Sequence, residues 1–345
     1  MDFEYSRHAT LGIEKKRQRF LEIIPGALSW TIIFGVCILS IIKPLVAAVI
    51  MIAFLLYWLL RLLYINIFLV LSYLRLEIEK NIDWMEGIFA VDQLKSSQVP
   101  FRVSEKINGL KNKISAQMHR QQLINLKKSN NLPPLSKDIL HLVLLPVICE
   151  TIDIVGPSIE AIKNGVYPLK NIVIVIALEE TASSQVKQDM DQIKEKYKNN
   201  FLDFFIIIHP ANDPNEAKVK GANTTFAARR AAEYFQKQNI PFENVLVSCF
   251  DADTVPDFSY FACLTYYFMI SPNRLRSSYQ PIPVYHNNIW DAPGFARIID
   301  IGTSFFQLVE ATNPQKLVTF SSHSMSFRAL VDVDYWPVNM VSDDS

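Results

Sequence analysis

Two carboxylates two residues apart are the strongest chemical signal in the chain. Asp251 and Asp253 flank Ala252 and follow directly on the apolar run VLVSCF (245–250). Two aspartates at a strand end can share one hard divalent cation, because Mg²⁺ and Mn²⁺ prefer oxygen ligands and also bind phosphate oxygens. Such a cation offsets the charge that develops on a diphosphate leaving group. We therefore expect Asp251 and Asp253 to bind Mn²⁺ or Mg²⁺.

The same three residues also suit a turn or a helix N-cap rich in aspartate, which needs no metal. The surrounding sequence bears on the choice. From about residue 139, apolar runs typical of buried strands alternate with segments typical of helices, and the runs cover 139–149, 171–178, 203–210 and 244–253. This alternation predicts an α/β fold with a mostly parallel sheet and helices on both faces.

Acidic residues follow three of these apolar runs. Glu150 comes after the first run, Glu179 and Glu180 after the second, and Asp251 and Asp253 end the fourth. In open parallel sheets, ligands bind outside the carboxyl ends of the strands. We therefore expect these acids to surround one ligand site.

Two long apolar runs occupy the beginning of the chain. Residues 23–42 carry no charge, and a second run starts at Leu45, after Lys43-Pro44. A helix of about 20 apolar residues is long enough to cross a bilayer, so the two runs predict a transmembrane hairpin. We expect four regions: a basic leader (1–22), the hairpin (23–74), an amphipathic basic linker (75–138) and a catalytic domain (139–345).

Basic residues flank the hairpin on both sides. The leader carries Lys15, Lys16, Arg17 and Arg19, and residues 102–128 contain seven lysines and arginines but a single acidic residue, Glu105. The positive-inside rule then places both ends in the cytoplasm, which predicts a multi-pass protein of the cell (plasma or inner) membrane with a cytoplasmic catalytic domain. A signal peptide is the competing interpretation, and the basic leader and second apolar run argue against it.

Residues 104–128 suit either a helix on anionic lipid or a helix packed on the catalytic domain.

The composition excludes several classes of protein. Half of the 345 residues are apolar, 20% are charged, and the mean hydropathy is +0.15. A disordered chain is therefore excluded. Basic and acidic residues number 34 each, so there is no overall basic field, and we expect no nucleic-acid partner.

The order of these motifs resembles the inverting family 2 glycosyltransferases, which have the GT-A fold. The first run ends PVICE (146–150), where the family has a Pro-x-x-Asn-Glu-like turn, and Tyr167-Pro168 precedes the second run as it does there. The second run ends in Glu179-Glu180 in place of the family's Asp-Asp-Gly, which reads the nucleotide base. The third run is followed by KGAN (220–223), similar to the family's Lys-Gly-x-Asn. The resemblance covers about residues 139–345.

The resemblance implies roles for individual residues. The donor is expected to be a nucleotide sugar, with UDP as the nucleotide, and a lysine beside helix N-terminal amides suits its phosphates. Later in the chain, Gln280-Pro281 matches a strand with Gln in the family. The expected donor-binding residues are Glu150, Glu179, Lys220, Asn223, Asp251 and Gln280, with Asp251 and Asp253 as the metal ligands.

The segment near the end of the chain supplies the expected catalytic base. SDD (342–344) stands where the family has Thr-Glu-Asp, so Asp344 is the expected base and Asp343 the fallback. The hairpin is similar to that of the membrane-bound cellulose-, hyaluronan- and chitin-synthase-like group, which implies polysaccharide biosynthesis, a glycan or lipid acceptor and contact with membrane lipid. The later Gln-x-x-Arg-Trp motif of that group does not occur. We therefore expect the chain to be a truncated form.

Two other functions are consistent with parts of the sequence. Asp251-Ala-Asp253-Thr254-Val255 also fits a haloacid-dehalogenase-like phosphatase, in which the first aspartate is a nucleophile. That family places its nucleophile on the first strand of the domain, whereas three strand-like runs precede Asp251. A non-catalytic membrane scaffold would account for the departures at Cys149 and at Glu179-Glu180.

Overall fold

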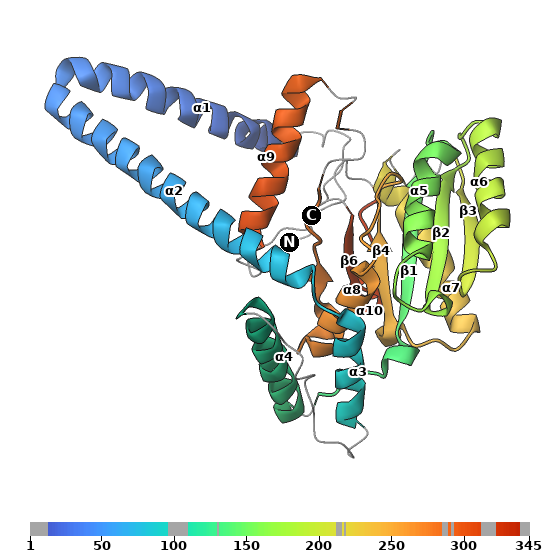
Figure 1. The fold of residues 1–345 in the computed structure, drawn as a ribbon. Coiled ribbons are helices and arrows are strands. Elements are labelled where there is room, and N and C mark those ends of the chain that lie inside the picture. The colour runs from blue at the N-terminus through green and yellow to red at the C-terminus, as the bar shows by residue number, and fades with distance from the viewer. Residues whose placement is uncertain are drawn as a thin grey trace. The chain divides into compact units, whose positions relative to one another are not determined.

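The computed structural model describes residues 13–95, 110–129, 131–211, 216, 219–284, 289–290, 293–311 and 322–338 (Figure 1). The chain divides into two compact units. One comprises Met1–Leu76 and Ile282–Lys316, and the other comprises Glu77–Pro281 and Leu317–Ser345. The second unit contains the expected sheet.

The sheet has six strands in the order β3-β2-β1-β4-β6-β5. Strands β1 to β4 are parallel, β6 runs antiparallel to β4, and β5 runs antiparallel to β6. The predicted mostly parallel sheet is therefore confirmed. The strands span Leu140–Val147 (β1), Ile172–Glu179 (β2), Asp203–His209 (β3), Val245–Cys249 (β4), Ser278–Tyr279 (β5) and His323–Ser326 (β6).

Apolar clusters cover both faces of the sheet, as predicted. In β1, Leu142 and Leu144 pack on one face, and Val143 and Leu145 pack on the other. Because the strand is buried on both faces, its sequence is a continuous apolar run instead of an alternating one. The first face packs on α7 (Lys220–Lys237) and α10 (Phe327–Asp332). The cluster on the second face includes residues of α5 (Ile152–Lys163), α6 (Ser184–Tyr197) and α8 (Tyr260–Ile270), together with α3 (Trp84–Lys95) and α4 (Leu110–Ser129), which contact α8.

The connection through α7 creates the point where a ligand is expected. Helices α5 and α6 connect β1 to β2 and β2 to β3, so the chain first moves outward in one direction. Helix α7 then returns across β3, β2 and β1 to β4 on the opposite side of β1. The strand order thus reverses between β1 and β4, and such a switch point opens a crevice at the carboxyl ends of the two strands.

Helix α4 packs against the body of this unit. Leu123 and Leu126 are buried in the cluster that contains α3 and α8, and the Tyr266 hydroxyl donates to Gln122 Oε1 at 2.7 Å. Lys127 and Lys128 are exposed. Among the described residues, this agrees with the packed helix and solvated basic face, one of the two alternatives for residues 104–128.

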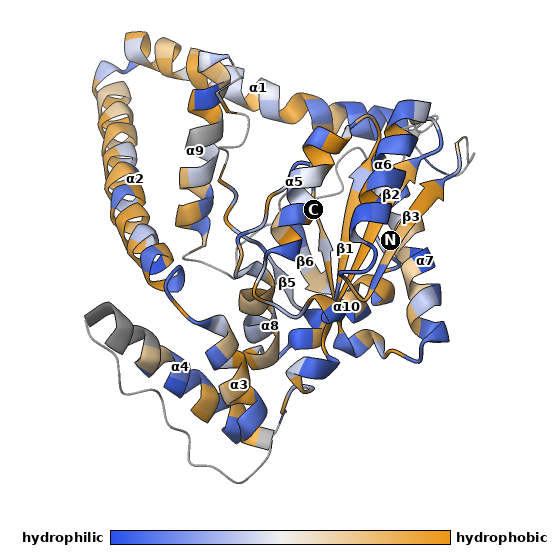
Figure 2. Cartoon of the chain, turned by 45° about the vertical axis from the view of Figure 1, so that its right-hand side comes forward, coloured by the Kyte–Doolittle hydropathy of each residue, from blue (hydrophilic) through white to orange (hydrophobic). Residues whose placement is uncertain are grey.

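The other unit contains α1 (Ile13–Ile42), α2 (Pro44–Glu79 apart from its last three residues) and α9 (Gly294–Glu310). Two helical stretches, Lys15–Ile42 and Pro44–Glu79, are long and apolar enough to cross a bilayer, and their most apolar windows are 0% and 6% buried. Figure 2 shows α2 coloured as hydrophobic along most of its length. By length and composition, both helices are therefore candidates for membrane spans.

Candidate active site

The structure brings most of the predicted donor-site residues to one edge of the sheet. Glu150, Glu179 and Asp251 follow or end the parallel strands β1, β2 and β4. Gln280 follows β5, which runs in the same direction, and Lys220 begins α7. Neighbouring strands lie roughly 4.8 Å apart, so these five positions share an edge about five strands wide.

Asp251 is held at the surface by a lysine. Its Oδ1 accepts a hydrogen bond from Lys220 Nζ at 2.6 Å, and the two side chains are 40% and 28% exposed. The Thr254 amide donates to the Asp251 carbonyl at 2.9 Å and closes a turn in which Asp253 is exposed. Both carboxylates of the motif therefore lie where solvent and a ligand can reach them.

Ser322 fixes the backbone of the same turn. Its Oγ accepts the Asp251 amide at 3.2 Å and lies 2.7 Å from Thr254 Oγ1. Ser322 has a φ of 64°, in the left-handed region that a residue with a side chain rarely adopts. The Asp-Ala-Asp motif alone does not reveal this contact, because the contact depends on the antiparallel pairing of β6 with β4.

The described residues suit a metal ion that is bound partly by protein and partly by substrate. They do not suit a metal ion that is enclosed by protein ligands alone. Within the described ranges, no group of three or more His, Cys, Asp or Glu side chains lies close enough to hold a metal ion. Mg²⁺-type sites often use one or two carboxylates and complete their shell with water and substrate phosphates. Asp251 and Asp253 supply that kind of donor set.

Glu150 binds its own loop. Its Oε2 accepts hydrogen bonds from the amides of Ile148 and Cys149 at 2.7 and 3.0 Å. These bonds satisfy two donors directly after β1, where the sheet ladder ends. The carboxylate thus sets the shape of the loop that follows β1 at the switch point.

Glu179 contacts a histidine at the neighbouring strand end. His209 Nδ1 lies 3.2 Å from Glu179 Oε2, and its Nε2 lies 2.8 Å from Glu216 Oε2. Each ring nitrogen of His209 thus faces a carboxylate, which can only accept hydrogen bonds when it is ionised. His209 is 7% exposed. The sequence does not reveal this cluster, because residues 30 and 7 positions away from the histidine supply its two carboxylates.

Two other predicted residues make local contacts. Asn223 is 1% exposed, and its Nδ2 donates to the Ala177 carbonyl at 2.8 Å, so it joins α7 to β2 beneath the edge. Gln280 Nε2 donates to the Pro281 carbonyl at 3.0 Å. The expected bases, Asp343 and Asp344, lie outside the described residues.

A buried hydroxyl network supports the turn from below. Ser324 Oγ lies 2.6 Å from Ser248 Oγ and 2.7 Å from the Tyr260 hydroxyl, which joins β6, β4 and α8. Burial raises the pKa of Tyr260 to about 12. The phenol is therefore neutral at physiological pH and serves as a hydrogen-bonding group.

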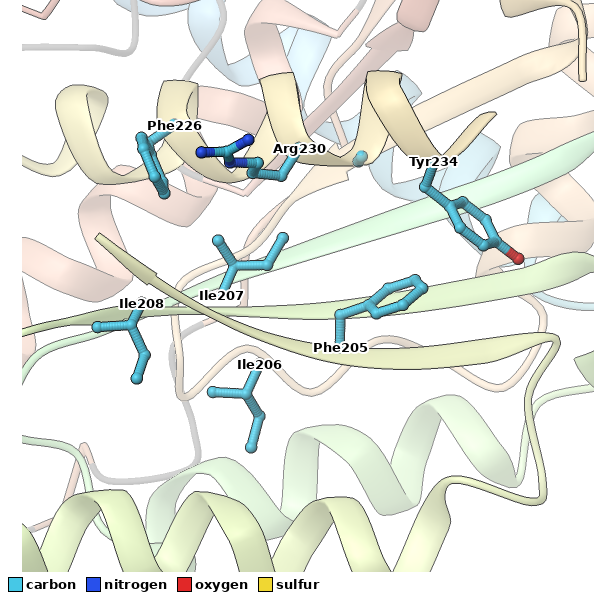
Figure 3. A pocket seen from close by; sticks show the side chains of 8 residues that line it. Phe205, Ile206, Ile207, Ile208, Phe226, Arg230 and Tyr234 are labelled. Carbon is cyan, nitrogen blue, oxygen red and sulfur yellow. The ribbon is translucent and has the colours of Figure 1, made fainter. Parts of the chain in front are cut away.

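A separate hollow of roughly 400 Å³ lies beside the outer strand β3 and α7 (Figure 3). In Figure 3, Phe205 and Ile207 point toward α7, whereas Ile206 and Ile208 point to the other side of the strand. Arg230 extends over this mostly apolar surface. None of the described residues that line the hollow belongs to the predicted donor site, so its size does not make it the candidate active site.

Comparisons with known proteins give distant similarities. No protein-family model matches the chain, and no curated protein matches it significantly. The mannosyltransferase PcManGT from Pyrobaculum calidifontis, solved in complex with GDP-Man and Mn²⁺, has a TM-score of 0.40 and 12% identity over 67% of this chain and 59% of that one. S. aureus TarS 1-349 in complex with UDP-GlcNAc has a TM-score of 0.36 and 12% identity over 60% and 51% of the two chains. At this level of similarity, these structures identify neither a family nor a reaction for the chain.

Proposed function

We propose that the chain is a membrane-anchored, inverting glycosyltransferase that moves a sugar from a nucleoside diphosphate to a hydroxyl of a glycan or lipid acceptor. One observation carries the proposal. The turn after β4 presents Asp251 and Asp253 at the switch point of a parallel sheet, with the Lys220 ammonium 2.6 Å from the Asp251 carboxylate. Carboxylates with an adjacent cation suit a diphosphate bound through a divalent metal.

In this proposal, Asp251 and Asp253 hold Mn²⁺ or Mg²⁺ against the diphosphate of a UDP-sugar. The metal supplies positive charge to the leaving diphosphate. Lys220 lies at the first turn of α7, where helix N-terminal amides favour an anion. Its ammonium therefore moves from the Asp251 carboxylate to a phosphate oxygen when the donor binds.

The remaining predicted donor residues have different parts in the proposal. Glu179 and Gln280 border the nucleotide at opposite sides of the edge. Glu150 shapes the loop after β1 through its two amide contacts. Asn223 acts from beneath the site, because its buried amide fixes the start of α7, and with it Lys220, against β2.

The chemical step is a single displacement. The acceptor oxygen forms a bond to the anomeric carbon as the bond from that carbon to the diphosphate oxygen breaks. The acceptor proton passes to the Asp344 carboxylate, and the nucleoside diphosphate leaves with the bonding electron pair. Asp343 is the alternative base. General-base catalysis of this kind contributes typically about 10²–10⁴-fold to a rate.

Membrane anchorage completes the proposal. The two apolar helices α1 and α2 meet at Lys43, and their side chains are almost all exposed. Basic residues flank the pair, which favours a cytoplasmic position for both ends. The catalytic domain then faces the cytoplasm, where nucleotide sugars are synthesised, and the protein is a multi-pass component of the cell membrane.

The Asp344→Asn variant tests the reaction. It keeps the side-chain shape but removes the proton acceptor, so transfer should fall by about 10²–10⁴-fold while Mn²⁺-dependent donor binding stays within a few-fold of wild type. Asp343→Asn, tested in parallel, shows which of the two aspartates is the base, because only the variant of the base should lose transfer. In the phosphatase alternative these acids are metal ligands, so metal affinity and rate would fall together. Loss of donor binding in Asp344→Asn would contradict the proposed role.

A further inference from the structure

Helix α9 carries an exposed apolar stripe. Phe295, Ile298, Ile299, Phe305 and Phe306 recur at the spacing of one helix face and are 76%, 72%, 52%, 50% and 56% exposed. Soluble monomers rarely expose a contiguous apolar patch, and where one occurs it usually marks a surface that binds a protein or a membrane. The stripe therefore indicates a partner that is absent from the isolated chain.

The opposite face of α9 is polar. Helix geometry places Arg297, Ser304 and Gln307 on the far side from the stripe. Arg297 NH2 donates to the Trp290 carbonyl at 3.0 Å, and its guanidinium lies 5.5 Å from the centre of the Trp290 ring. Trp290 itself is 76% exposed just before the helix begins. Tryptophan beside arginine is typical of the interface between a bilayer and water.

The length and the unit of α9 indicate lipid as the partner. With 17 residues, α9 is at the lower limit for a membrane span, and its polar face does not suit the centre of a bilayer. It belongs to the same compact unit as α1 and most of α2, the two helices with the length and apolarity of membrane spans. Helices with one apolar and one polar face lie in the plane of the interface, with the apolar side about 5–10 Å below the headgroup boundary.

We propose that α9 is an interfacial helix whose stripe, Phe295 to Phe306, lies in the acyl region of the membrane that α1 and α2 cross. The inference rests on the membrane anchorage in the proposed function and adds a third contact with lipid. The segment Ile282–Lys316 joins β5 to the segment before β6, so α9 lies in the chain between Gln280 and Ser322. The stretch of chain between these two site residues thus contacts lipid through α9.

Site-directed spin labelling of the full chain tests this proposal. Cys37, Cys149 and Cys263 are replaced by serine, buried Cys249 is kept, and single cysteines are introduced along α9. The labelled protein is placed in phosphatidylcholine and phosphatidylglycerol vesicles, and accessibility to O₂ and to a water-soluble nickel chelate is compared. Labels at Phe295, Ile298 and Phe305 should favour O₂ and lie about 5–10 Å below the headgroups, whereas labels at Ser304 and Gln307 should favour the chelate.

Two control labels separate this inference from the anchorage itself. A label at Ile52, exposed in the middle of α2, should favour O₂, and a label at Asp191, exposed on α6, should favour the chelate. If Ile52 reports water, the anchorage fails. If Ile52 reports lipid but the stripe reports water, the interfacial helix is wrong. A stripe shielded from both reagents would overturn it as well, because a protein partner would then cover the face.

Discussion

The two ends of the same sheet edge hold their acidic residues in different ways. At the β2–β3 end, Glu179 and Glu216 are 19% and 16% exposed and enclose His209. At the β4–β6 end, Asp251 is 40% exposed and Asp253 is exposed, on a turn whose backbone is bound by Ser322. The carboxylates of the first end share one nearly buried protein partner, whereas those of the second lie on a surface turn, where Asp251 pairs with the partly exposed Lys220.

This difference indicates which acids can change partners. A carboxylate that is hydrogen-bonded to a nearly buried imidazole is costly to remove, because the ring nitrogen left behind has no replacement partner in a poorly solvated site. A carboxylate on a surface turn can exchange a lysine for a metal at little cost to the fold. We therefore assign metal binding to the β4–β6 end, and we expect the β2–β3 end, where Glu179 borders the nucleotide, to contribute more to stability.

The largest effect is expected at Asp253. Asp253→Ala should abolish Mn²⁺-dependent donor binding and transfer, because one of two protein ligands is lost. The melting temperature should stay within a few degrees of wild type, since the side chain is exposed. Asp191→Ala, an exposed aspartate on α6, is the matched control and should leave binding unchanged. A variant that unfolds while wild-type binding ignores chelator would instead support the aspartate-rich turn.

The opposite pattern is expected at His209. His209→Gln should lower the free energy of unfolding by about 1–3 kcal/mol, because Glu179 and Glu216 lose the imidazole that both of them contact. Mn²⁺ affinity should change by less than a few-fold. Denaturant titration measures the first quantity and metal titration the second. Adding Glu179→Gln should recover part of the loss, and a large fall in metal affinity would break the division between the two ends.

A smaller effect is expected at Ser322. Ser322→Ala removes the hydroxyl that contacts the Asp251 amide and Thr254, and one such hydrogen bond is worth about 1 kcal/mol. Donor and metal affinity should fall by about five- to tenfold, with little change in the turnover of bound substrate. Ser322→Gly removes the same hydroxyl but suits the positive φ. The glycine variant should therefore bind donor and metal as weakly as the alanine variant but be more stable than it. Wild-type affinity in both variants would contradict the role of Ser322 in holding the backbone of the turn.

The sequence predicts the parallel core because burial dictates it. Strands β1 and β2 lie wholly inside the unit, so selection for burial on both faces leaves runs of Leu, Val and Ile that stand out from the polar helices. The acids at their ends are recognisable because each run stops at a charge. Ser183 is the N-cap of α6, and its side chain accepts the Val186 amide at 3.2 Å.

The part of the edge formed by β5 and β6 cannot be predicted from the sequence in the same way. Strand β5 has two residues and β6 has the polar sequence HSMS, and neither shows a period or an apolar run. Strand β6 pairs with β4, and β5 pairs with β6, so both pairings join segments that are distant in the sequence. The role of Ser322 and the Glu179–His209–Glu216 cluster are therefore properties of the tertiary structure, and local propensity does not encode them.

The most direct test of the account is whether a nucleoside diphosphate binds the full-length chain through a divalent metal. UDP is titrated into the detergent-solubilised protein with Mn²⁺ and then with excess EDTA, and the series is repeated with Asp253→Ala. The account predicts saturable binding with Mn²⁺ that is lost with EDTA and absent in the variant. UDP binding that persists unchanged in EDTA, or that is the same in Asp253→Ala, would contradict it.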